Sequence, residues 1–430
     1  MTTKGDSLEN VVIVGASAAG LSAADGLREG GYDGRIVILG DEQHEPYDRP
    51  TLSKKLLVSQ GEPQLHALRT PERLEADGVT LLLGHRAVGL DVDRHYVVTE
   101  NGDAVPWDAV IITTGSRPRT LVTTEEETLP VLRTPADLRL LREAAARYGQ
   151  VTLIGAGLIG LEIASSLSGH HVEVTVINDL ELPLRHILGE PVAEQVRELH
   201  RRHGVDLLLG VSVESVSGGP GSYSVQLSDG STHRTSFVLV GIGVQANDEW
   251  LDGSGVALDA GVVVDAAGRA SVPGVWAAGD VARLLSHPSL PESTRVEHWT
   301  HAIEHGRHVG LNVARGSHAD YAAVPYFWTE QYGRRFHGYG RIRPGDTAQL
   351  VEGALDEEEY LVLYGSGEEL HAVVSCGCVR SLRGYRKLLE RNGTWREALD
   401  LAGHTAPIHT TLPSIPTDAT TNVRKNVEAS

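Results

Sequence analysis

Two segments of the chain share one pattern, in which a short apolar run leads directly into a glycine turn and then into small and apolar residues. The first segment joins the run 11–14 to Gly15, and the second joins 151–154 to Gly155. Another apolar run follows each of them. Strand, glycine turn, helix and strand form a βαβ unit. The two turns lie much farther apart than the roughly 20–50 residues of a solenoid repeat, so we expect two similar domains.

The second turn carries a complete G-x-G-x-x-G motif, formed by Gly155, Gly157 and Gly160. In such a motif the first glycine makes the turn, the second lets a pyrophosphate approach the backbone, and the third lets the helix pack on the strand. The helix N-terminus adds amides and the positive end of its dipole. The motif therefore predicts dinucleotide binding, and a purely structural turn is the alternative.

The first turn departs from this motif at its centre, where Ser17 replaces the middle glycine. We expect this turn to bind a dinucleotide through the run Gly15, Ala16, Ser17, Ala18, Ala19 and Gly20. Asp41 follows the second apolar run, near the position of a ribose-binding acid. A solvated loop aspartate is the alternative interpretation of Asp41.

Two dinucleotide turns in one chain indicate two dinucleotides, and a flavin with a nicotinamide is the natural pair for passing a hydride. A Gly279–Asp280 turn after the apolar run 275–278 fits this interpretation. The carboxylate of Asp280 could accept hydrogen bonds from a polyol chain, although Asp also serves as a helix N-cap.

Charge and cysteine usage exclude several other classes of protein. The net charge of −19 disfavours binding to nucleic acid or to an anionic membrane surface. No apolar run approaches the roughly 20 residues of a membrane helix, and the polar N-terminus lacks the apolar core of a signal peptide. Only Cys376 and Cys378 are present, so a disulfide framework is absent and a cytoplasmic location is expected. We interpret both as packing thiols, and we expect no metal site, since the spaced pair His200 and His203 lacks a ligand set.

Six further motifs together resemble one family, the FAD-dependent NAD(P)H:ferredoxin reductases of oxygenase and cytochrome P450 systems, which are relatives of apoptosis-inducing factor. The motifs are 46–54, 132–134, the GAGLIGLE run that ends at Glu162, 278–280, 296–299 and 326–328. The resemblance implies an α/β fold with two doubly wound Rossmann-like dinucleotide-binding domains and an α+β C-terminal domain. It divides the chain into an FAD domain (1–120 and 245–325), an NAD(P)H domain (121–244), a C-terminal domain (326–403) and a flexible tail (404–430).

The resemblance also assigns roles to individual residues. Asp41 and Glu42 would meet the adenosine of FAD, and Asp280 would bind the ribityl chain. The expected flavin neighbours are Arg49, Lys54, Arg133, Glu297, His298 and Trp328. Lys54 and Glu162 would form a catalytic ion pair beside the reactive flavin nitrogen. A cation there favours the anionic reduced flavin.

The second site departs from the family at the end of its second strand, where Asn178 replaces the usual acid and Asp179 follows. Gly243, after the apolar run 237–240, is a further candidate contact. We expect NADH rather than NADPH, because Asp179 and Glu181 would repel a 2′-phosphate. NADPH stays open as a cofactor, since Arg185 or His186 could still bind that phosphate.

The expected partner is an iron–sulfur ferredoxin that supplies an oxygenase or a P450, and the protein is expected to be a monomer or a homodimer. Since such ferredoxins are usually acidic, docking needs a local basic patch on this acidic chain. The candidates near Trp328 are Arg307, Arg334, Arg335, Arg341 and Arg343. Two alternatives stay open: a flavin oxidase or reductase acting on oxygen or a small molecule, and a redox-sensing flavoprotein with little turnover.

Overall fold

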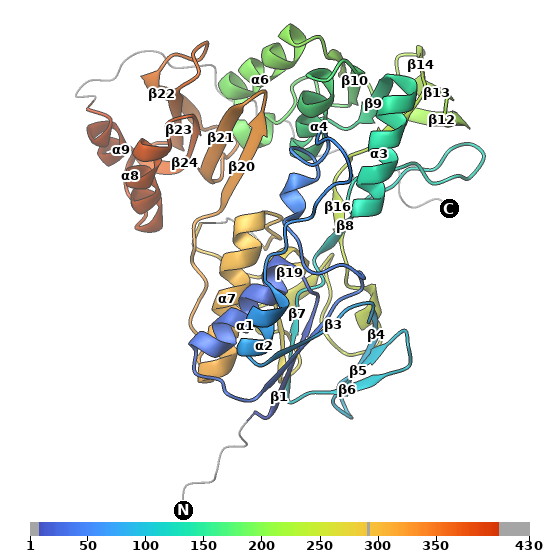
Figure 1. The fold of residues 1–430 in the computed structure, drawn as a ribbon. Coiled ribbons are helices and arrows are strands. Elements are labelled where there is room, and N and C mark those ends of the chain that lie inside the picture. Colours follow the sequence, from blue (N-terminus) through green and yellow to red (C-terminus); the bar gives the residue numbers. More distant parts are fainter. Residues whose placement is uncertain (1–7, 290–292, 404–430) are drawn as a thin grey trace, which may run out of the picture.

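The computed structural model describes residues 8–289 and 293–403, so the tail predicted at 404–430 lies outside the described residues (Figure 1). A five-stranded parallel sheet forms its first layer, in the order β18-β7-β1-β2-β3. Its strands are β1 (Asn10–Val14), β2 (Arg35–Leu39), β3 (Val79–Leu82), β7 (Ala109–Ile112) and β18 (Val275–Ala277). The chain thus leaves this sheet after β7 and returns to it at β18.

Two helices cover one face of this sheet and pack closely on each other: α1 (Ala18–Glu29) and α7 (Trp299–Arg315). Glycines on α7 make the close approach possible. A Cβ at Gly310 would lie 2.1 Å from the carbonyl oxygen of Ala23, and one at Gly306 would lie 2.2 Å from that of Ala19. Both helices start near the carboxyl ends of the strands, so their N-termini point toward the same region.

The second parallel sheet has the order β11-β10-β9-β15. Its strands are β9 (Gln150–Ile154), β10 (Glu173–Asn178), β11 (Asp206–Leu209) and β15 (Val238–Val240). Its helices are α3 (Pro135–Tyr148), α4 (Leu158–Ser168), α5 (Arg185–Leu188) and α6 (Glu190–Arg202). A three-stranded antiparallel sheet adjoins it, made of β12 (Val213–Gly219), β13 (Ser222–Leu227) and β14 (Thr232–Thr235). The strand and helix predicted from the second glycine turn are therefore confirmed.

The C-terminal part is a five-stranded antiparallel sheet in the order β20-β21-β24-β23-β22, covered by two helices. Its strands are β20 (Tyr326–Gln331), β21 (Arg334–Gly340), β22 (Thr347–Gly353), β23 (Tyr360–Ser366) and β24 (Glu369–Cys376). The helices are α8 (Val379–Glu390) and α9 (Trp395–Leu401). Figure 1 shows this part beside the second sheet, with β20 directed toward α4. The predicted fold class is confirmed.

The remaining elements are short. They are α2 (Pro71–Ala76), β4 (Ala87–Asp91), β5 (Tyr96–Thr99), β6 (Ala104–Pro106), β8 (Ser116–Pro118), β16 (Val244–Ala246), β17 (Val262–Val264), β19 (Ala282–Leu284), and three 3₁₀ turns at Arg49–Thr51, Glu249–Leu251 and Gly279–Val281. β8 pairs with β16 where the chain passes between the two parallel sheets, which supports the domain division that we propose near 120 and 245. Within the described ranges, no helix is long and apolar enough to cross a membrane.

Candidate functional site

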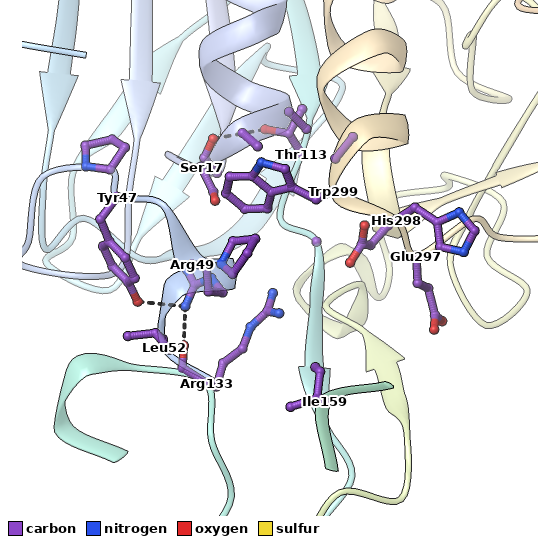
Figure 2. Close-up of a pocket in the computed structure, with 18 of the residues that line it drawn as sticks. Ser17, Tyr47, Arg49, Leu52, Thr113, Arg133, Ile159, Glu297, His298 and Trp299 are labelled. Carbon is purple, nitrogen blue, oxygen red and sulfur yellow. Dashed lines mark hydrogen bonds between the residues drawn. The ribbon is translucent and has the colours of Figure 1, made fainter. Parts of the chain in front are cut away.

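One pocket lies where the first parallel sheet, α4 and β20 meet (Figure 2). It contains most of the residues predicted to contact a flavin dinucleotide. These are Gly15, Ala16, Ser17, Ala18, Ala19, Asp41, Glu42, Arg49, Lys54, Arg133, Glu162, Asp280, Glu297, His298 and Trp328. The segments that supply them are far apart in the sequence. The fold therefore brings together side chains that the sequence analysis could only group by resemblance.

The first glycine turn forms one end of this pocket. Gly15 has φ +120°, and a Cβ there would lie 2.2 Å from the carbonyl oxygen of Thr113. A Cβ at Gly20 would lie 1.9 Å from the carbonyl oxygen of Gly15, so Gly20 serves helix–strand packing rather than the pocket lining. Ser17 occupies the N-cap position of α1, but its side chain makes no capping hydrogen bond. The first amides of α1 thus have no side-chain acceptor, which is the arrangement that binds phosphate groups.

Arg133 is the cation best placed to meet an anionic ligand. Figure 2 shows its guanidinium pointing into the pocket. Burial, and secondly the charge of Arg49, lower the pKa of Arg133. Among the described residues, no acceptor lies within hydrogen-bond distance of this guanidinium. A half-buried guanidinium without a hydrogen-bond acceptor in the described part of the chain fits the diphosphate of a dinucleotide.

Glu42 and Arg49 line the pocket and are bound to each other and to neighbouring protein groups. Arg49 binds Glu42 at 2.7 Å, and it also donates to the Tyr47 hydroxyl at 2.8 Å and to the Arg133 carbonyl. The Tyr47 hydroxyl donates in turn to Glu42 at 3.0 Å. Glu42 is therefore already engaged by protein donors. The exposed Asp41, directly after β2, is the freer of the two carboxylates for a ribose.

The predicted ion pair between Lys54 and Glu162 is present, with 2.6 Å between Nζ and Oε2. The two residues come from the first half of the chain and from α4. Lys54 Nζ also lies 4.7 Å from the centre of the Trp328 ring, and the Arg335 guanidinium lies 5.4 Å from it. Trp328, which lines the pocket, thus has two cations close to its ring, an arrangement that favours a fixed ring.

Two hydroxyls that the sequence analysis did not single out also bind Glu162. Ser53 Oγ donates to Oε2 and Thr329 Oγ1 donates to Oε1, both at 2.6 Å. Each is the sequence neighbour of a predicted residue, Lys54 or Trp328. Adjacency was the only signal in the sequence, since nothing local shows that both hydroxyls face the same carboxylate.

The Gly279–Asp280 turn contributes Asp280 to the lining of the pocket. Gly279 has φ +76°, and its amide donates to His305 Nδ1 at 3.3 Å. Asp280 accepts one hydrogen bond from Ser116 at 2.9 Å through Oδ2. Its other oxygen, Oδ1, has no partner among the described residues, so it can accept from a ligand hydroxyl.

Glu297 and His298 precede α7 at the edge of the pocket. Burial raises the pKa of Glu297; Arg295, which binds it at 2.7 Å, opposes that rise, and the Asp280 charge adds to it. Burial lowers the pKa of His298, so this imidazole is neutral at pH 7. The two residues line the pocket at the start of the helix, and their contact with a flavin stays a prediction.

The second glycine turn lies outside this pocket lining. A Cβ at Gly155 would lie 2.3 Å from the carbonyl oxygen of Gly241, and one at Gly157 would lie 4.0 Å from the same oxygen. A Cβ at Gly243 would meet no atom within 4 Å. Gly160 packs against the carbonyl of Gly155, since a Cβ at Gly160 would lie 2.3 Å from that carbonyl oxygen. Leu158 and Ile159, which follow the turn on α4, do line the pocket, so one helix start adjoins both sites.

Asn178 binds this second turn. Its Oδ1 accepts from the Ala156 amide at 3.0 Å, and its Nδ2 donates to the Leu180 carbonyl at 3.0 Å. The carboxamide therefore shapes the turn, and each of its polar atoms keeps one further hydrogen-bonding position. Asp179 is exposed beside it, and Arg185 is held by Glu190 at 3.0 Å.

Thiol and metal chemistry are not found at the pocket. Cys376 and Cys378 are free thiols of the C-terminal part, and neither lines the pocket. Burial raises the pKa of each to about 11, so both are protonated at pH 7. Over the described ranges, no cluster of three His, Cys, Asp or Glu side chains has the geometry of a metal site.

Two glycine-turn βαβ folds that adjoin one pocket define an oxidoreductase of the two-dinucleotide class. Comparison with known families agrees: residues 9–306 match the pyridine nucleotide-disulphide oxidoreductase family and residues 326–411 match the reductase C-terminal family. The chain belongs to the pyridine nucleotide-disulphide oxidoreductase family.

Individual relatives are similar over most of the chain. The ferredoxin–NAD(+) reductase component of the p-cumate 2,3-dioxygenase system of Pseudomonas putida is 34% identical over 76% of this chain and 80% of its own. Human apoptosis-inducing factor 3 is 33% identical over 86% of this chain, which spans only 61% of that longer protein. The crystal structure of the ferredoxin reductase for the CYP199A2 system from Rhodopseudomonas palustris superimposes with a TM-score of 0.84 at 28% identity, covering 90% of this chain and 95% of that one.

Proposed function

We propose that this protein is an FAD-dependent NAD(P)H:ferredoxin reductase that supplies electrons to an oxygenase or a cytochrome P450. The observation that carries the proposal is the Lys54–Glu162 pair beside Trp328, in a pocket that has no cysteine. Disulfide reductases of this family class need a cysteine pair next to the flavin. Here the electrons must leave to an external acceptor, and Trp328 is the aromatic group at the mouth.

The residues of the pocket fit FAD. The amides at the start of α1 and the free guanidinium of Arg133 would hold the diphosphate, and Asp280 would accept from the ribityl hydroxyls. FAD, when bound, accepts a hydride and releases electrons singly. Lys54, fixed by Glu162, places a positive charge at the pocket, while Trp328 limits the access of water. His298 stays neutral and adds no competing charge.

We propose NADH as the hydride donor that binds at the second glycine turn. Support comes from the carboxylate of Asp179, exposed at the turn, and from the ion pair that occupies Arg185. A 2′-phosphate would meet a negative charge there without a free arginine. A cytoplasmic location is part of the proposal, supported by two unpaired thiols.

We propose a docking surface for the ferredoxin that differs from the one expected from the sequence. Most of the predicted arginines are neutralised by neighbours: Arg307 by Glu29, Arg335 by Glu330, and Arg343 by Glu369. Arg307 also lies two turns along α7 from its start at the pocket. Helix α8 instead presents cations without an ion pair among the described residues.

These cations are Arg380, Arg383 and Lys387, all exposed on α8. A groove lined by Arg383, Lys387 and Tyr326 runs beside them, and Tyr326 also lines the main pocket. The basic surface is thus continuous with the candidate flavin site. We propose that an acidic ferredoxin docks on α8 and on the edge of Trp328.

Anaerobic spectroscopy tests the function. The purified protein should contain flavin, NADH should bleach it, and reoxidation should be fast with an acidic ferredoxin and slow with oxygen. Rapid oxygen consumption without ferredoxin would instead identify an oxidase. Negligible bleaching by either nicotinamide would identify a redox-sensing flavoprotein.

A further inference from the structure

A buried row of polar side chains extends from Glu162 away from the pocket. Thr329 Oγ1 binds Glu162 at 2.6 Å, and Gln331 Nε2 lies 3.5 Å from that Oγ1. Gln331 Oε1 lies 2.9 Å from His200 Nε2, and His200 Nδ1 lies 3.0 Å from the Tyr332 hydroxyl. Thr329, Gln331 and His200 each have 0% exposed surface. The row therefore crosses from α4 through β20 to α6, with its three central members shielded from water and Tyr332 half-buried at its far end.

Chemistry fixes the direction of every hydrogen bond in this row. A carboxylate only accepts, so the Thr329 hydroxyl donates to Glu162, and its oxygen accepts from the Gln331 amide. The Gln331 carbonyl then accepts from His200 Nε2–H, which leaves Nδ1 to accept from the Tyr332 hydroxyl. Burial lowers the pKa of His200 to about 4, so the imidazole is neutral, as this arrangement requires.

The pattern of β20 explains why two of these residues lie in line. Thr329 and Gln331 are two positions apart, so both point to the same face of the strand, the one that packs on α4 and α6. The primary amide of Gln331 cannot pass a proton along without changing to an unstable tautomer. The row is therefore a fixed, aligned set of dipoles rather than a proton path, and each donor strengthens the next.

The two oxygens of Glu162 have separate tasks. Oε2 accepts from Lys54 and Ser53, whereas within the described residues Oε1 accepts from Thr329 alone. Without the Thr329 hydroxyl, a buried carboxylate oxygen would lack a donor, and the carboxylate would rotate to share Lys54. The ammonium would then leave its position over Trp328.

We infer that Thr329, Gln331 and His200 are positioning residues, which orient the Glu162 carboxylate and thereby hold the Lys54 ammonium at the candidate flavin site. The inference rests on the proposed function for its consequence at the flavin. Its structural part, the position of Lys54, stands independently. The C-terminal part of the chain thus contributes to the site both Trp328, at its mouth, and the support of its catalytic pair from behind.

The test compares Thr329→Val, which keeps the shape and removes the hydroxyl, with Thr329→Ser, which keeps the hydroxyl. Chemical acetylation of Lys54 is read by mass spectrometry in protein without bound flavin, relative to the exposed neighbour Lys55. We expect Lys54 to label about 5- to 10-fold faster in the Val variant, as expected for the loss of about one hydrogen bond, and at the parent rate in the Ser variant. This readout needs neither NADH nor ferredoxin, so it separates this inference from the proposed function.

A second measurement reads the flavin. The midpoint potential of the flavin-loaded Val variant should become more negative, because a displaced cation stabilises the reduced flavin less. Its anaerobic reduction by NADH should slow about 10-fold. Gln331→Met should change the Lys54 labelling rate, the midpoint potential and the rate of reduction by NADH in the same directions, but by smaller amounts. This variant provides the test if Thr329→Val does not fold. Parent-like labelling and potential in both Thr329→Val and Gln331→Met would overturn the inference.

Discussion

The most direct prediction concerns Asp280 and the affinity for FAD. Oδ2 of this carboxylate is held by Ser116 at 2.9 Å, while Oδ1 faces the pocket without a partner in the part of the chain that the structure describes. A hydrogen bond to a charged group contributes about 1.5–3 kcal/mol. Since about 1.4 kcal/mol corresponds to a tenfold change, Asp280→Ala should weaken FAD binding about 10- to 150-fold.

Two companion variants separate charge from geometry. Asp280→Asn keeps an acceptor and loses the charge, so its dissociation constant should lie between those of the parent and the Ala variant. Removal of this charge should also bring the pKa of Glu297 down toward its usual value, because the Asp280 charge contributes to raising it. Ser116→Ala leaves Oδ1 untouched and should change FAD affinity only a few-fold.

The assay is titration of the flavin-free protein with FAD, followed by quenching of flavin fluorescence or by calorimetry. Asp33→Ala, on the turn before β2, is a control that should bind like the parent. An Asp280→Ala variant that binds FAD as tightly as the parent would refute the assignment of Asp280 to the ribityl chain.

Four further predictions follow. First, kcat/KM should be higher for NADH than for NADPH, and Asp179→Ala should narrow the ratio; a parent preference for NADPH would contradict the proposal. Second, Gly310→Ala should lower the thermal midpoint, since its Cβ would lie 2.1 Å from a carbonyl oxygen of α1 and such overpacking costs about 1–3 kcal/mol. An unchanged thermal midpoint would show that α1 and α7 can move apart without loss of stability. Third, burial lowers the pKa of His305 to about 3, whereas a histidine in the unfolded chain titrates near ~6.5. Between these two pH values only the unfolded state binds the proton, so the thermal midpoint should fall as the pH drops from ~6.5 toward ~3. His305→Gln should flatten this pH dependence, and an unchanged slope in that variant would contradict the prediction. Fourth, Arg383→Glu and Lys387→Glu, each made singly, should raise KM for an acidic ferredoxin and leave flavin reduction by NADH unchanged. The rise in KM should be smaller at 1 M salt, where the Debye length is ~3 Å. Arg94→Glu, on the exposed turn between β4 and β5, changes the charge by the same amount and is the control; an unaffected KM at low salt in both α8 variants would place docking elsewhere.

Local sequence rules were sufficient for the two glycine turns. Gly15 and Gly155 both have positive φ, and both approach a neighbouring carbonyl more closely than any side chain would allow. The physical requirement lies within a few residues of each glycine, so the motif carries it. The same holds for the strands and helices that flank the turns.

Side-chain partners were not predictable in the same way, even where they lie only a few residues apart. Asn178 was a candidate contact of the second dinucleotide, and the structure adds that its carboxamide holds the turn. Glu42 was expected to meet the adenosine, and the structure adds that Arg49 and Tyr47 bind it. Both assignments stay predictions, and only the fold shows which protein groups also bind these side chains.

For the predicted basic patch, the pairing of the strands decides which arginines are neutralised by a neighbouring carboxylate. Arg335 was a docking candidate because it follows Trp328 closely in sequence. The hairpin of β20 and β21 pairs it directly with Glu330, a contact that the hairpin register fixes. Arg343 meets Glu369 only because β24 returns to the same sheet, which no local pattern reveals.

β20 links the features that the proposed reaction needs. One face of the strand supports Glu162 through Thr329, and the ring of the neighbouring Trp328 lies close to the Lys54 ammonium and the Arg335 guanidinium. A ferredoxin that docks on α8 would rest against the groove lined by Tyr326, the first residue of the same strand. Any shift of β20 on docking would therefore act on the electron exit and on the catalytic ion pair together. This predicts that Thr329→Val, which breaks only the link to Glu162, should weaken any effect of bound ferredoxin on the flavin potential, whereas Arg383→Glu should weaken the binding itself.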